Sequence, residues 1–170
     1  MKYLLIALLT SLSGTSHALT SDQNQPLEIT SESAELREQS GYAVYTGSVR
    51  LTQGSLQIYS DKIELYFKDK KFHEAIISGK KPKQAYFQQT PTKGEAPVRG
   101  KADRIVYAGD DDEIRLLGDA AFCQKGSEQK GKRIIYDMKS DIMKAKARTR
   151  TVFRPDSAPG NCDHIQSDYR

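Results

Sequence analysis

The chain of 170 residues has no tryptophan, only two cysteines, and no apolar run of membrane-spanning length after its first residues. It also lacks Gly-x-Ser-x-Gly, His-Glu-x-x-His, Cys-x-x-Cys and a phosphate-cradling glycine loop. A secreted carbohydrate-acting enzyme would need paired carboxylates among aromatic side chains, so the lack of tryptophan counts against that class too. We therefore predict a protein that is not an enzyme and has no cofactor or metal.

The carboxylates that could suggest a site have simpler structural interpretations. The run from Asp110 to Glu113 could bind a cation, but it lacks the alternating ligands of a calcium loop and is more typical of a solvated hairpin turn. Asp61 and Asp103 could form an acid–base pair. Because both occupy equivalent positions in a repeat described below, a structural role at a bend is favoured.

The first residues have the pattern of a secretory signal peptide. Lys2 precedes an apolar run, Tyr3 to Leu12, that is too short to span a bilayer, and Ser16-His17-Ala18 places small residues where a signal peptidase cuts. We predict that residues 1–18 are cleaved after Ala18; the alternative is an uncleaved anchor. The mature chain would then be soluble and lie outside the cytoplasm.

In an oxidising compartment, the pair Cys123 and Cys162 is most simply explained as a disulfide. Closing a loop of about 40 residues would stabilise the fold by roughly 4 kcal/mol in the chain-entropy model. It would also tether residues 155–170, which we expect to form an irregular tail. A metal site at Cys162 and His164 lacks the remaining ligands.

A formal net charge of +4 conceals two basic clusters, one from Lys68 to Lys83 and one from Lys125 to Arg150. Nucleic acid is an unexpected partner outside the cytoplasm, whereas an anionic lipid headgroup or membrane surface fits the charge. The alternative is that most of these residues only solubilise the outward faces of strands.

Apolar and polar residues alternate with a period of two in many short segments, such as Ile63 to Phe67 and Ile134 to Tyr136. Turn-forming residues separate these segments, whereas a helical stripe is missing, so the pattern predicts antiparallel β structure. We expect Lys139 to Arg150 to be strand or strand edge as well, because it has no apolar helical face.

One motif, a small residue followed by a charge and two inward positions, occurs four times, beginning at Ser31, Ser60, Ala102 and Gly131. Such a repeat predicts layers of strands stacked along an axis. In the first two copies the alternation also slips by one residue, from Ile58 to Ile63 for example. A slip of this kind predicts a β-bulge or bend.

Several of these segments, in this order and spacing, resemble the OstA/LptA family. The resemblance rests on Gln25 to Glu32, Tyr45 to Gly54, Ser60 to Ile63, Val98 to Ala102, Leu117 to Ala120 and Lys130 to Ile134. It implies that residues 19–154 form a twisted, V-shaped antiparallel β-jelly roll of about sixteen strands.

The resemblance also implies a function. Family members act in the periplasm as lipopolysaccharide carriers that shelter lipid A acyl chains between the inner and outer membranes. The implied partners are lipopolysaccharide, an LptC-like inner-membrane protein at the N-terminal edge, an LptD-like outer-membrane protein at the C-terminal edge and further copies stacked head to tail. The alternative is a structural adaptor of the same fold that joins partners through strand edges and carries no lipid.

Two sets of residues are predicted to face the lipid. The alternative for each residue is that it belongs to the ordinary hydrophobic core. By the resemblance these are Leu27, Ile29, Tyr86 and Tyr107. By alternation we add Leu36, Val49, Leu51, Ile58, Ile63, Leu65, Ile105, Leu116, Phe122, Ile134 and Tyr136.

Overall fold

The computed structural model describes residues 22, 25–79, 81–90, 96–109, 111, 113–137, 140, 142–153 and 162–169. The expected signal peptide, residues 1–18, lies outside them, as do Asp110, Asp112 and residues 154–161. No helix among the described residues is long and apolar enough to cross a membrane.

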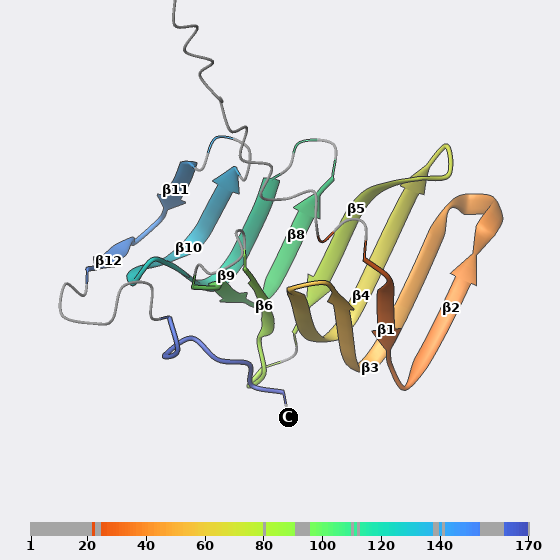
Figure 1. Cartoon of the computed structure of the whole chain (residues 1–170), viewed down its shortest axis with the longest axis horizontal. Coiled ribbons are helices and arrows are strands. Elements are labelled where there is room, and N and C mark those ends of the chain that lie inside the picture. The colour runs from red at the N-terminus through yellow and green to blue at the C-terminus, as the bar shows by residue number, and fades with distance from the viewer. Residues whose placement is uncertain are drawn as a thin grey trace, which may run out of the picture.

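The described residues form one antiparallel sheet of twelve strands (Figure 1). In chain order the elements are β1 (Leu27–Thr30), β2 (Ser33–Arg37), the 3-10 turn η1 (Glu38–Ser40), β3 (Tyr42–Gln53), β4 (Leu56–Lys68), β5 (Lys71–Ser78), β6 (Ala85–Gln89), β7 (Val98–Ala102), β8 (Arg104–Ala108), β9 (Glu113–Gln124), β10 (Ser127–Asp137), β11 (Ile142–Lys146) and β12 (Arg150–Val152). The prediction of strand within Lys139 to Arg150 is confirmed by β11.

Four long strands, β3, β4, β9 and β10, bend midway and belong to two leaves of the sheet. In the first leaf their halves pair with β2, β5, β8 and β11. In the second leaf their other halves pair with β1, β6, β7 and β12. The expected antiparallel jelly roll is confirmed. Counting each long strand once in each leaf reconciles twelve strands with the expected number of about sixteen.

Two β-bulges make the bends. In β3, Gly47 and Ser48 lie opposite a single residue of β4, Asp61, because Thr46 pairs with Lys62 and Val49 with Ser60. In β9, Gly118 and Asp119 likewise lie opposite one residue of β10. Both glycines have left-handed φ angles, 83° and 78°, which a residue with a Cβ adopts at a cost. The predicted bend between Ile58 and Ile63 is thus confirmed, with the extra residue on the partner strand.

The inner faces of the two leaves meet in one apolar core. The first leaf contributes Ile63 and Leu116, and the second contributes Val49 and Phe122, all fully buried. Phe122 also contacts two other aromatic rings, those of Phe87 and Tyr136. Burying each such side chain contributes about 1.5–3 kcal/mol. This packing holds the leaves together near the row of bends between them, which we call the fold line.

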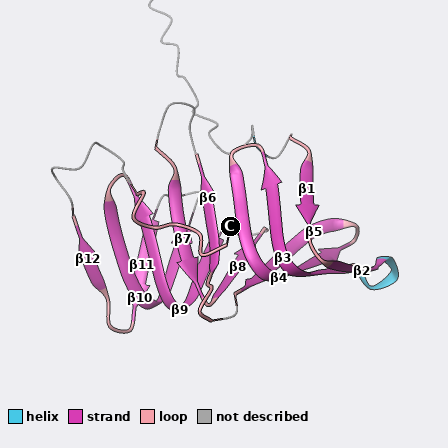
Figure 2. Ribbon diagram, turned by 90° about the horizontal axis from the view of Figure 1, so that it is seen from below, coloured by secondary structure: helices cyan, strands magenta, loops and turns pink. Residues whose placement is uncertain are grey.

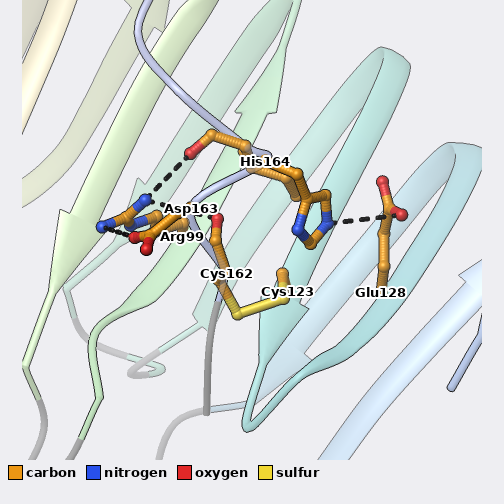
Figure 3. The surroundings of a disulfide bond; sticks show 7 residues. Arg99, Cys123, Glu128, Cys162, Asp163 and His164 are labelled. Carbon is orange, nitrogen blue, oxygen red and sulfur yellow. Dashed lines mark hydrogen bonds and ion pairs between the residues drawn. A yellow bond between two sulfur atoms is a disulfide. The ribbon is translucent and has the colours of Figure 1, made fainter. Parts of the chain in front are cut away.

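Residues 162–169, which we call the C-terminal strap, cross the outer face of the second leaf without forming a strand (Figure 2). The predicted disulfide between Cys123 and Cys162 is formed and ties the strap to β9. Arg99 of β7 donates from Nη1 to the carbonyls of Cys162 and Ile165, and its Nη2 lies 2.8 Å from the Asp163 carboxylate (Figure 3).

Candidate functional site: an apolar cavity between the leaves

A cavity of about 370 Å³ lies between the two leaves. Its size is within the range of small-molecule pockets. Apolar side chains form most of the wall, and they come from both leaves. The lining residues are Asp22, Leu27, Leu51, Gln53, Leu56, Ile58, Leu65, Phe67, Phe72, Ala75, Ile77, Phe87, Gln89, Ile105, Tyr107 and Ile114.

Six of the residues expected to face lipid line this cavity: Leu27, Leu51, Ile58, Leu65, Ile105 and Tyr107. Others lie in the adjoining core, namely Val49, Ile63, Leu116, Phe122, Ile134 and Tyr136. Ile29 is partly buried and packs against the same core. The structure therefore brings most of the predicted set onto one continuous inner surface.

Two of the expected residues lie elsewhere. Tyr86 is buried on the opposite face of β6, in a second cluster with Cys123, Cys162 and Ile165. The aromatic residue of β6 that lines the cavity is its neighbour Phe87. Because side chains alternate along a strand, an alignment error of one residue exchanges the two faces. Leu36 has the inward alternation but lies on the edge strand β2, where 63% of it is exposed.

The sequence-based set omitted several lining residues, including Phe67, Phe72, Ile77 and Ile114. Alternation carries a usable signal for some of them, since Phe67 and Ile114 each lie two positions from a chosen residue. Phe72 is positioned by its ring, which stacks on Tyr107 with the centroids 5.5 Å apart and meets Phe67 edge-on at 6.2 Å. These three rings form an aromatic wall at the end of the first leaf.

One polar cluster interrupts the apolar lining. The Asp22 carboxylate accepts hydrogen bonds from the Ser55 amide at 3.0 Å, the Ser55 hydroxyl at 2.6 Å and the Gln89 side-chain amide at 3.0 Å. Burial raises the pKa of Asp22, but the bonds from Ser55 and Gln89 outweigh it and hold the pKa below its ordinary value. An apolar cavity with one polar margin suits a ligand that has an apolar and a polar part.

The carboxylates considered from the sequence lie outside the cavity lining. Asp103 contacts Lys81 at 3.6 Å and Gln84 at 3.1 Å, and its backbone amide bonds to the carbonyl of Gly118. Asp111 and Glu113 both pair with Arg115. Within the described residues, no group of three or more His, Cys, Asp or Glu side chains could hold a metal ion.

Each end of the sheet presents edge strands. Among the described strands, β1 and β2 pair only with β3, and β11 and β12 pair only with β10. Exposed apolar side chains accompany both ends, Leu36 on β2 and Ile142 on β11. Such edges can be extended by a strand from another chain.

Comparisons with known proteins agree on one group. The family model described as "LptA/(LptD N-terminal domain) LPS transport protein" matches residues 28–142. Lipopolysaccharide export system protein LptH of Pseudomonas aeruginosa is 33% identical over 81% of this chain and 78% of its own length. Lipopolysaccharide export system protein LptA of Haemophilus influenzae is 32% identical over 91% of each chain.

A solved structure is also similar. The crystal structure of LptH, described as the LptA-homologous periplasmic component of the lipopolysaccharide transport device of Pseudomonas aeruginosa, superposes with a TM-score of 0.72. The match has 29% sequence identity and covers 79% of this chain and 99% of that one.

Proposed function

Because the chain belongs to the LptA/LptD N-terminal domain family of lipopolysaccharide transport proteins, we propose that it is a periplasmic carrier of lipopolysaccharide in transit from the inner to the outer membrane. The acyl chains of lipid A would lie in the cavity between the leaves. This role needs no chemical step, in keeping with relatives whose names describe export and transport.

The observation that carries the proposal is the apolar cavity lined from both leaves. An acyl chain of about ten methylenes loses roughly 8 kcal/mol of favourable burial when water surrounds it. A carrier must therefore supply an apolar surface for as long as the lipid is outside a membrane. The residues at the rim support such a use, because Leu27 is 50% exposed and Phe67 is 38% exposed beside the buried wall.

The proposal assigns lipid contact to the lining residues and treats the deeper inner residues as core. On β6 it names Phe87 in place of Tyr86. The polar margin at Asp22, Gln53 and Gln89 would face the part of the lipid where the acyl chains join the sugar, since amides and hydroxyls there can exchange hydrogen bonds with these side chains.

For the partners we propose an LptC-like protein at the N-terminal edge and an LptD-like protein at the C-terminal edge, with head-to-tail stacking of copies by the same contacts. The edge strands at each end support this arrangement. The strap is compatible with this arrangement, because it bonds to β7, to β10 and to Gln84 just before β6 and forms no strand that pairs with β11 or β12.

Photocrosslinking tests lipid binding with two matched pairs of positions. A photoreactive residue replaces Leu27 or Tyr107 in the cavity, or its outward counterpart on the same strand, Glu28 or Arg104. Each variant is mixed with purified lipopolysaccharide and irradiated. Adducts at Leu27 and Tyr107 but not at Glu28 and Arg104 are the expected result.

Equal labelling within each pair would contradict the cavity as the binding site. If all four variants were folded and none gave an adduct, the carrier function would be wrong. The chain would then be an adaptor of the same fold that joins its partners through strand edges.

A further inference from the structure

Six cations gather around the fold line at the C-terminal end of the sheet. They lie on β10 to β12 and on the connection between β11 and β12, and all six are exposed. We call this group the basic ridge; it consists of Lys130, Lys132, Arg133, Lys146, Arg148 and Arg150.

The strand register places like charges side by side in this ridge. Arg133 on β10 lies directly opposite Lys146 on β11, and Lys130 lies directly opposite Arg150 on β12. Like charges in directly opposed positions destabilise a sheet. The arrangement therefore costs stability in the free protein, and a bound polyanion would relieve that cost.

Acidic neighbours neutralise only part of the ridge. Lys130 pairs with Glu128 at 2.9 Å, and Lys132 lies within electrostatic reach of Asp119. For the side chains of Arg133, Lys146, Arg148 and Arg150, the described residues provide no hydrogen bond or ion pair.

Cations along the N-terminal part of the fold line are differently placed. Lys62 pairs with Glu64 at 2.9 Å, and Lys81 pairs with Asp119 at 2.9 Å. These two cations are therefore neutralised by carboxylates, unlike Arg133, Lys146, Arg148 and Arg150.

The backbone also keeps a cation at the bend itself. Ala147 and Arg148 both have left-handed φ angles, 61° and 55°, although neither is glycine. The amide of Lys132 donates to the carbonyl of Ala147 at 3.1 Å, which fixes the connection beside the β10 residue that faces the bulge of β9. Non-glycine residues in this conformation are strained, so Arg148 is held at the fold line by the surrounding structure.

The ridge and the cavity lie on different surfaces. Arg133, Lys146 and their neighbours alternate with inward residues such as Ile134 and therefore face outward, whereas the cavity is enclosed by inward side chains of β1, β3–β6, β8 and β9. None of the ridge residues lines the cavity, so the ridge is a separate surface that can meet an anion other than the cargo.

We propose that the basic ridge docks the C-terminal end of the protein onto the anionic surface of a phospholipid bilayer. Several lysines and arginines at one surface attract anionic headgroups cooperatively, and salt weakens the attraction. The ridge itself consists only of charged side chains, so salt should reverse the contact. It goes beyond lipid carriage and does not depend on it. Docking would direct the edge strands β11 and β12 toward a membrane.

Vesicle co-sedimentation tests the proposal with the full mature chain. The vesicles are phosphatidylcholine alone, or phosphatidylcholine mixed with phosphatidylglycerol. The ridge variant carries Arg133→Gln, Lys146→Gln and Arg150→Gln. The control variant carries Lys68→Gln, Lys70→Gln and Lys71→Gln, which removes the same charge from three exposed lysines at the β4–β5 hairpin.

The native protein should bind the mixed vesicles, release them as salt is raised, and ignore phosphatidylcholine alone. The ridge variant should bind on the order of 100-fold more weakly, and the control variant should lose less than about tenfold. The ridge variant should also unfold at an unchanged or higher temperature, because a like-charge pair is removed at each of two positions.

Three results would overturn the proposal. One is native protein that fails to bind the mixed vesicles at low salt. Another is equal loss in the two variants, which would assign binding to net charge alone. The third is loss of lipopolysaccharide crosslinking in the ridge variant with vesicle binding intact, which would make the cargo's phosphates the ligand. Lipid carriage is measured separately at Leu27 and Tyr107, so either proposal can fail alone.

Discussion

Removing the disulfide should destabilise the whole domain and not only release the strap. The bond joins residues 39 positions apart, and the loop that it closes contains β10, β11 and β12, the entire C-terminal edge. In the unfolded chain the closed loop restricts the conformations of all the residues that form β10 to β12 in the folded protein. The chain-entropy relation gives about 4 kcal/mol for a loop of this length.

The variant to make is Cys123→Ala with Cys162→Ala, since a single substitution would leave a free thiol. Both sulfurs are buried, and alanine keeps part of the apolar contact with Ile165 and Tyr86. Urea unfolding followed by circular dichroism should show a free energy of unfolding lower by about 4 kcal/mol, within the usual range of 2–5 kcal/mol.

Arg99→Ala in the oxidised protein separates the contribution of loop closure from that of the strap's polar contacts. It removes the hydrogen bonds to the carbonyls of Cys162 and Ile165 and the ion pair with Asp163, which hold the strap in place. The loop stays closed by the disulfide. We expect a loss of about 1–3 kcal/mol. A change below about 1 kcal/mol in the double alanine variant would refute the loop-closure reasoning. An equal loss in both variants would assign the stabilisation to the strap's contacts.

Three further predictions concern the core, a bulge and the cavity margin. Phe122→Ala should lower the free energy of unfolding by about 3–5 kcal/mol, because the ring is fully buried between both leaves; calorimetry showing under about 1 kcal/mol would contradict this packing. Gly118→Ala should destabilise by about 1–2 kcal/mol or more, since the residue is left-handed and its new Cβ would meet a carboxylate oxygen at 2.6 Å. Gly131→Ala is the matched control, with its nearest contact at 3.3 Å, and an equal effect would refute the bulge argument. Asp22→Asn should lower the unfolding temperature at neutral pH by weakening the bonds from Ser55. Because the folded pKa of Asp22 is depressed, its contribution is present above the unfolded pKa and lost as pH falls through the folded value. The difference between the native protein and the variant should therefore shrink below about pH 4, and a difference that persists in acid would contradict the assignment.

The sequence alone was sufficient for features that depend on local pattern. Alternation in Ile63 to Phe67 predicts a strand, the slip after Ile58 predicts a bend, and two cysteines in an exported chain predict a disulfide. Each of these signals is carried by neighbouring residues or by composition. A short window of sequence therefore contains the information that is needed.

Features that depend on strand register could not be predicted from a short window of sequence. Tyr86 and Phe87 are adjacent aromatics, and only the pairing of β6 with β4 and β7 decides which faces the core. The excess of cations near the C-terminus was visible, but the opposition of Arg133 and Lys146 required knowing how β10 and β11 align. Such facts arise from the pairing of segments that are distant in sequence.

The division between packed core and cavity wall has a geometric cause that alternation cannot reveal. Along the first-leaf half of β4, the inward residues become more exposed with distance from the fold line: Ile63 is 0% exposed, Leu65 5% and Phe67 38%. The leaves are tied together at the bulges, so side chains near the bulge fill the space between them, and those further out meet across a widening gap. Identical alternation thus yields packed core at one end of a strand and an open apolar wall at the other. It follows that lipid contact should be graded along each strand, being strongest at Phe67 and weakest at Ile63.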